Sequence, residues 1–270
     1  MTKTVFSISK KTVTLPLIAN IPHSSTYIPP LIRQSFILND NELEVELLKM
    51  TDWFVDELFS EVSEVGGTSV IYNVSRLVVD PERFENDKEE IMSTKGMGVI
   101  YTKTSDGSEL RTHIPSKEER EDLLKRYYRP YHKAMESETE TLLDSSGKCL
   151  ILDCHSFPSK PLPYELKQDL NRPDICFGTD RFHTPKHLIE SVEGFFQEHN
   201  LSTGLNRPFK GTYVPLKFLE KDKRVSSLMV EINRKLYMHE GTGVKSDGFD
   251  ETRRIIGETV KRILETFFQL

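Results

Sequence analysis

Apolar and polar positions alternate in blocks along this chain, and the blocks predict strands separated by helices. Short apolar runs bounded by turn-forming residues are typical of strands buried on both faces. Such runs occupy residues 12–21, 68–74, 149–153, 174–178 and 226–233. Apolar residues at helical spacing occupy 40–63, 116–143, 185–199 and 250–268. This order predicts one α/β domain over residues 1–270, with a mostly parallel or mixed central sheet and helices on both faces.

Three local signals refine this prediction. Ser116 followed by Glu119 fits a capping box and predicts that a helix begins there. Pro130 lies inside a helical pattern and predicts a kink or a second helix start, close to His132, which either lines the site or belongs to the core or helix surface. Residues 81–115 form too long a connection for an ordinary loop, so we expect a flap over a site or a partly disordered segment.

The composition favours an enzyme-sized globular domain that acts on small molecules. The 270 residues are 37% apolar and carry a formal net charge of −6, which supports a sizeable core and argues against nucleic-acid binding. No run approaches 18 apolar residues, and the N-terminus lacks the apolar segment of a signal peptide. We therefore expect a cytoplasmic protein with no membrane partner.

The three cysteines predict no disulfide framework. Cys149, Cys154 and Cys176 are odd in number, lie in or beside apolar strands and show no CxxC spacing. They are interpreted as reduced core residues.

Polar side chains interrupt three of the predicted strands or follow them directly. His23 ends the run "LPLIANIPHSS", His155 ends "LILDCHSF", and Glu231 lies inside "SSLMVEINR". Open α/β sheets build ligand sites at the carboxyl ends of their strands. A single histidine there is more often structural, but two together suit zinc, which usually takes a carboxylate as third protein ligand and water in the fourth position.

Two aspartates are candidates for supporting this metal site. Asp52, predicted in a helix beside Trp53, is a candidate third ligand, because an unpaired carboxylate in an apolar setting is costly; the alternative is an aspartate in a helix first turn or on the surface. Asp153 is a candidate partner that fixes the ring orientation of His155.

Glu231 is the candidate general base. A carboxylate between Val230 and Ile232, on a strand covered on both faces, should be paired, protonated or functional. Beside a zinc site it could take a proton from water and deliver it to a leaving nitrogen. The alternative is that Glu231 simply pairs with Arg234 or another basic residue.

Two segments supply candidate groups for an anionic substrate. Arg76 and Arg83 in "VSRLVVDPERF" could hold a carboxylate or an oxyanion. Arg207, Lys210 and Tyr213 in "NRPFKGTYVP" could reach the same ligand. For each of these residues an exposed structural role is the alternative.

Eight motifs occur in an order that resembles one known family, the N-formylglutamate amidohydrolases. They are "PHSS", "TDW", "SRLVVDPERF", "RPYH", "LDCHS", "PDICFGT", "PFKGTYV" and "VEINRKLYM", and they cover residues 20–240. The resemblance implies a fold related to the zinc exopeptidases (phosphorylase/hydrolase-like), one zinc per chain, and cleavage of N-formyl-L-glutamate to formate and glutamate in histidine breakdown.

The resemblance also implies roles for individual residues. His23, Asp52 and His155 match the zinc ligands and Glu231 the general base, while Arg76 and Arg83 match residues that bind substrate carboxylate or oxyanion. Related exopeptidases usually place a glutamate three residues after the first histidine, where this chain has Thr26.

The chain departs from the family pattern at Ser25, Glu82 and Thr212, which replace glycine, asparagine and glycine. These departures cluster where substrate should lie. Two alternatives therefore stay open, a metallo-carboxypeptidase or amidase acting on small peptides, and an inactive homologue that only binds an acidic ligand.

Overall fold

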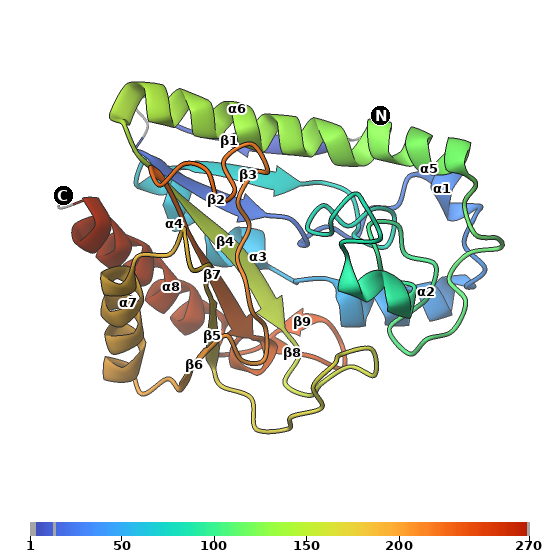
Figure 1. The fold of residues 1–270 in the computed structure, drawn as a ribbon. Coiled ribbons are helices and arrows are strands. Elements are labelled where there is room, and N and C mark those ends of the chain that lie inside the picture. The colour runs from blue at the N-terminus through green and yellow to red at the C-terminus, as the bar shows by residue number, and fades with distance from the viewer. Residues whose placement is uncertain (1–3, 13–14, 269–270) are drawn as a thin grey trace.

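A mixed seven-stranded sheet forms the centre of the computed structural model, which describes residues 4–12 and 15–268 (Figure 1). The strands lie in the order β1-β3-β2-β4-β7-β5-β6. Their bounds are β1 Phe6–Ser9, β2 Leu17–Ile21, β3 Thr68–Tyr72, β4 Cys149–Phe157, β5 Ile175–Gly178, β6 Thr203–Leu205 and β7 Val225–Asn233. The central four, β3, β2, β4 and β7, are mutually parallel, while β1 and β5 run antiparallel to their neighbours β3 and β7. The prediction of an α/β fold with a mixed sheet is confirmed.

Helices cover both faces of this sheet. In Figure 1, α6 runs along one face, and α7 and α8 lie against the other. The helices are α1 Pro30–Arg33, α2 Asp40–Met50, α3 Val55–Leu58, α4 Glu61–Glu64, α5 Lys117–Leu123, α6 Arg129–Ser146, α7 Lys186–Glu198 and α8 Phe249–Ile263. Shorter turns are η1 Ile91–Lys95, η2 Leu124–Tyr128, η3 Arg234–Leu236 and η4 Leu264–Phe268, and a small hairpin joins β8 Met238–His239 to β9 Val244–Lys245.

Strand alternation divides the core into two layers. Ile18 of β2 packs with α6 residues on one face, whereas its neighbours Leu17 and Ala19 pack with α7 and α8 on the other. Both layers are apolar, which explains why the central strands appear in the sequence as continuous apolar runs. The three cysteines are buried and free, as predicted.

Several predicted boundaries were wrong. β1 was missed because it is a short, largely exposed edge strand, and β2 begins at Leu17 rather than residue 12. β4 continues to Phe157, so His155 lies within the strand. Ser116 does cap α5 through a capping box with Glu119, and Pro130 lies in the first turn of α6 after the π-helical turn η2.

The predicted helix over 40–63 is three helices in the structure. α2 ends at Met50, Thr51 is extended with ψ 138°, and Phe54 is left-handed with φ 62° before α3 begins. Asp52 lies in this break, where its backbone N–H donates to the His23 carbonyl at 3.0 Å. Asp52 is therefore not helical, and the break places it beside the end of β2.

Segment 81–115 is packed against the body of the protein. It contains η1 and two isolated β-bridges, and the buried Glu46 carboxylate of α2 accepts hydrogen bonds from the Ser105 N–H and hydroxyl at 2.6 and 2.8 Å. Within the described residues, no helix has both the length and the apolar character needed to cross a membrane.

Candidate active site

The three predicted metal ligands meet at the carboxyl edge of the parallel strands. Asp52 Oδ2 lies 3.1 Å from His155 Nδ1 and 3.7 Å from His23 Nδ1. All three side chains are almost fully buried, and one potential ligand atom of each lies within 4.8 Å of the others. His23 Nδ1 is buried without a hydrogen-bond partner among the described residues. An unpartnered imidazole nitrogen facing a carboxylate and a second imidazole fits a divalent metal.

The other nitrogen of each imidazole is held by an aspartate. His23 Nε2 lies 2.8 Å from Asp80 Oδ1, and His155 Nε2 lies 3.0 Å from Asp153 Oδ1. A carboxylate on the far nitrogen fixes both tautomer and ring orientation in metal sites. Asp153 thus lies where the sequence predicted an orienting partner, whereas the role of Asp80, which lies between Arg76 and Arg83 in the sequence, emerges only from the structure.

Glu82 lies beside His155, a contact that the sequence did not predict. The sequence marked it as a departure near the substrate, but its Oε2 lies 3.2 Å from His155 Nε2, and its Oε1 accepts from Asn20 Nδ2 at 2.6 Å. Burial raises the pKa of Glu82, and the Asp153 charge adds to the rise. Glu82, Asp153 and His155 form a second group with ligand spacing. We favour the first group, because Asn20 already binds both carboxylates of the second.

Asp52 is kept ionised by its surroundings. Burial alone would raise its pKa, but the hydrogen bond with His155 and the nearby His23 imidazole hold the pKa well below the usual range. Its second oxygen, Oδ1, accepts from Arg234 Nη2 at 3.1 Å. Arg234 therefore pairs with Asp52, and no ion pair joins it to Glu231 in the described part of the chain, contrary to the alternative considered from the sequence.

Glu231 lies directly beside His155, because β7 pairs with β4 in a register that places these two residues opposite each other. The side chain is buried, and Oε2 has no hydrogen-bond partner in the described residues. Burial raises the pKa of Glu231 to about 8, and the charges of Asp52 and Asp153 act in the same direction. An unpaired carboxylate next to a metal-type cluster is suited to accepting a proton.

Arg76 and Arg83 converge on Asp80. Arg76 Nη2 donates to Asp80 Oδ2 at 2.8 Å, and Arg83 Nε lies 3.6 Å from the same oxygen. Because Asp80 also holds His23, both guanidinium groups lie next to the cluster. Arg83 Nε is buried and makes no hydrogen bond within the described chain, so this residue retains donor capacity.

The predicted residues of segment 206–213 divide into two groups. The Tyr213 N–H donates to Asp153 Oδ2 at 2.8 Å, and its hydroxyl lies 3.2 Å from His132 Nδ1. Arg207 instead pairs with Asp169 at 2.8 Å on the surface, and Lys210 is exposed. The structure brings Tyr213 to the cluster but not Arg207 or Lys210, whose substrate roles stay predictions.

The buried imidazole of His132 is expected to make the stability of the protein depend on pH. Burial lowers its pKa from 6.5 to about 4, although its ring bonds the Pro81 carbonyl. Between these values the unfolded chain binds a proton that the folded protein does not, so stability falls as pH drops from 6.5 to 4, by about 3 kcal/mol from this residue. Urea unfolding of wild type and His132→Gln over this range should show a shallower decline in the variant; parallel profiles would contradict the assignment.

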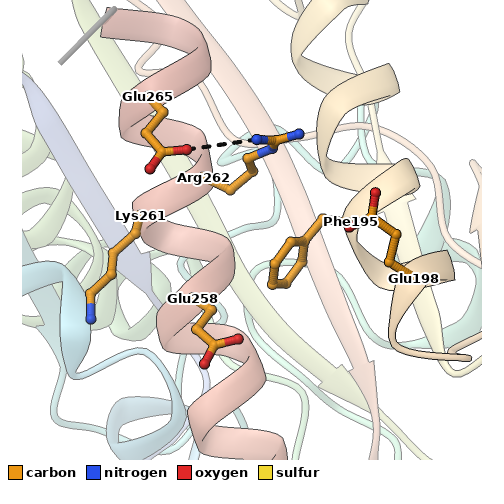
Figure 2. Close-up of a pocket in the computed structure, with 6 residues that line it drawn as sticks. All are labelled: Phe195, Glu198, Glu258, Lys261, Arg262 and Glu265. Atoms are coloured by element: carbon orange, nitrogen blue, oxygen red, sulfur yellow. Dashed lines mark ion pairs between the residues drawn. The ribbon is translucent and has the colours of Figure 1, made fainter.

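A surface hollow lies elsewhere, between α7 and the end of α8 (Figure 2). Its volume is about 360 Å³, and the drawn side chains are mostly charged, with one ion pair between Arg262 and Glu265 at 3.7 Å. None of its lining residues belongs to the cluster.

A buried histidine–aspartate–histidine group, with an unpaired glutamate beside it at the carboxyl edge of an α/β sheet, defines a candidate metal-dependent hydrolase site. Comparison with known proteins agrees that the protein is a hydrolase. Residues 15–238 match the model of the N-formylglutamate amidohydrolase family, and the chain belongs to this family. Its members are hydrolases that act on an amide bond.

Individual relatives cover nearly the whole chain. N-formylglutamate deformylase from Pseudomonas aeruginosa is 27% identical over 262 residues, covering 93% of each chain. The protein of the same name from Pseudomonas putida is 27% identical over 230 residues, covering 84% of this chain and 83% of its own. The crystal structure of N-formylglutamate amidohydrolase from Ralstonia eutropha superposes with a TM-score of 0.86 at 25% identity, covering 99% of this chain and 100% of that one.

Proposed function

We propose that this protein hydrolyses the formyl amide of N-formyl-L-glutamate, or of a closely related N-acyl amino acid, and releases formate and the free amino acid. The observation that carries the proposal is the buried group of His23, Asp52 and His155 with Glu231 beside it, in a member of this family. Two imidazoles and a carboxylate suit zinc, and we expect one ion per chain. A bound zinc ion would polarise the amide carbonyl and lower the pKa of a nearby water.

Glu231 has the position of the general base, opposite His155 on the neighbouring strand. It would accept a proton as the water oxygen bonds to the formyl carbon. The same proton would then pass to the amide nitrogen as the carbon–nitrogen bond breaks, leaving formate and an amine.

Arg76 and Arg83 would have different roles, one stabilising the developing oxyanion and the other binding the substrate carboxylate. Arg76 is held by two hydrogen bonds to Asp80 and one to the Tyr101 hydroxyl, and this fixed geometry suits stabilising the oxygen on which charge develops. Arg83 is less constrained and 22% exposed at its side chain, which suits binding the carboxylate of an acidic substrate.

The substrate is tested by measuring formate. Zinc-loaded protein should release formate from N-formyl-L-glutamate much faster than from N-formyl-L-glutamine, the isostere that lacks the side-chain charge. Short peptides serve as the second comparison. Faster cleavage of peptides would favour the peptidase alternative, and saturable binding without hydrolysis would favour the inactive homologue.

A further inference from the structure

We propose that Arg234 is a positioning residue of this site, which holds Asp52 so that only Oδ2 is available to a metal. The inference rests on the proposed function, because it assumes that Asp52 is a metal ligand. It concerns a residue that the sequence presented only as a possible partner of Glu231.

The Arg234 guanidinium joins three parts of the chain. Arg234 lies in η3, directly after β7, and is only 4% exposed. Its Nη2 donates to Asp52 Oδ1 at 3.1 Å, its Nη1 to the Lys49 carbonyl at 2.7 Å, and its Nε to the Ser156 hydroxyl at 3.2 Å. One planar group thus links the end of α2, the candidate ligand Asp52 and the residue that follows His155.

These contacts restrict the Asp52 carboxylate from both sides. Oδ1 is taken by Arg234, whereas Oδ2 lies 3.1 Å from His155 Nδ1 and 3.3 Å from the Ser156 N–H. Asp52 lies in a break between helices, so no regular backbone ladder fixes it. The planar Arg234 guanidinium can fix the orientation of the Asp52 carboxylate. A lysine ammonium at the same position would supply a similar charge without three simultaneous, directed hydrogen bonds.

The alternative role for Arg234 is electrostatic or purely structural. Arg234 lines a small hollow together with Lys49 and Lys160. If the positive charge of this region were what matters, removing Lys160 should have a similar effect. Lys160 makes no ion pair among the described residues and does not contact Asp52, so Lys160→Gln is the matched control.

The test compares metal binding by folded proteins. Zinc dissociation constants would be measured by competition with a chelator for wild type, Arg234→Lys and Lys160→Gln, each checked by circular dichroism. We expect Arg234→Lys to weaken zinc binding about 10- to 100-fold, the usual range for residues that orient a ligand. Lys160→Gln should bind zinc as wild type does.

A second measurement reports the coordination itself. The visible spectrum of cobalt(II)-loaded protein should change in Arg234→Lys, because the freed Oδ1 can then also bind the ion, and stay unchanged in Lys160→Gln. If Arg234→Lys fails to fold, Ser156→Ala removes the partner of Nε alone and should give a smaller shift in the same direction.

The outcomes separate this inference from the proposed function. Wild-type zinc affinity and an unaltered cobalt spectrum in folded Arg234→Lys would overturn the role of Arg234 and leave the proposed function standing. Zinc affinity that depends on Arg234, without formate release by wild type, would support the inference and count against the substrate. A wild-type protein that binds no zinc would overturn both.

Discussion

Replacing Glu231 by glutamine is expected to lower the rate of amide hydrolysis by about 10²- to 10⁴-fold, the usual contribution of a general acid–base group. Glutamine has nearly the same shape but cannot accept the proton of the attacking water. Glu231 is not one of the three residues proposed to hold the metal, so zinc should stay bound. The measurements are formate release and zinc content on the same preparation, and an active variant would refute the assignment.

The same variant also tests whether burial raises the pKa of Glu231, through the pH dependence of stability. The pKa of Glu231 is raised from 4.5 to about 8 in the folded protein, so over this range the folded state binds a proton that the unfolded chain has lost. The Glu231 carboxyl therefore contributes a loss of stability as pH rises through this window, opposite in sign to the contribution of His132, and glutamine removes the Glu231 contribution. The unfolding free energy of metal-free Glu231→Gln, measured relative to that of wild type, should accordingly increase from pH 4.5 to 8.

Replacing His155 by alanine is expected to remove both zinc and activity. The change deletes one of the three proposed metal ligands and leaves Asp52 and Asp153 without the imidazole that each contacts. Since changes to orienting residues alone weaken metal binding about 10- to 100-fold, loss of a ligand should weaken it by more than about 100-fold. Metal content after dialysis, about one zinc per chain in wild type and almost none in the variant, checks this.

His183→Gln is the matched control for this variant. His183 is also buried, but its nitrogens bond the Val225 carbonyl and the Glu220 N–H rather than a metal-type group. It should cost stability and still retain zinc. Equal zinc loss in both variants would mean that metal binding responds to general damage to the fold. Wild type that holds no metal even after reconstitution would contradict the mechanism outright.

The sequence by itself determined the class of fold and indicated most of the candidate site. Continuous apolar runs bounded by turn-forming residues predicted the central strands, because strands covered on both faces need apolar residues throughout. It also indicated that His23, His155 and Glu231 would meet, since carboxyl ends of neighbouring parallel strands lie at one edge of a sheet. Ordered motifs then indicated the family, which the comparison confirmed.

Only the tertiary structure decided which charged groups face each other. Asp52 was predicted in a helix, yet it lies in a break whose position depends on a backbone bond to His23. Arg234 pairs with Asp52, 182 positions away, and Glu82 lies 3.2 Å from His155, a contact that the motif alone did not indicate. Such pairings depend on strand register and on loops packed over the sheet, and a buried charge takes whichever partner that packing supplies. Local sequence patterns predict that a partner is needed; the fold determines which residue provides it.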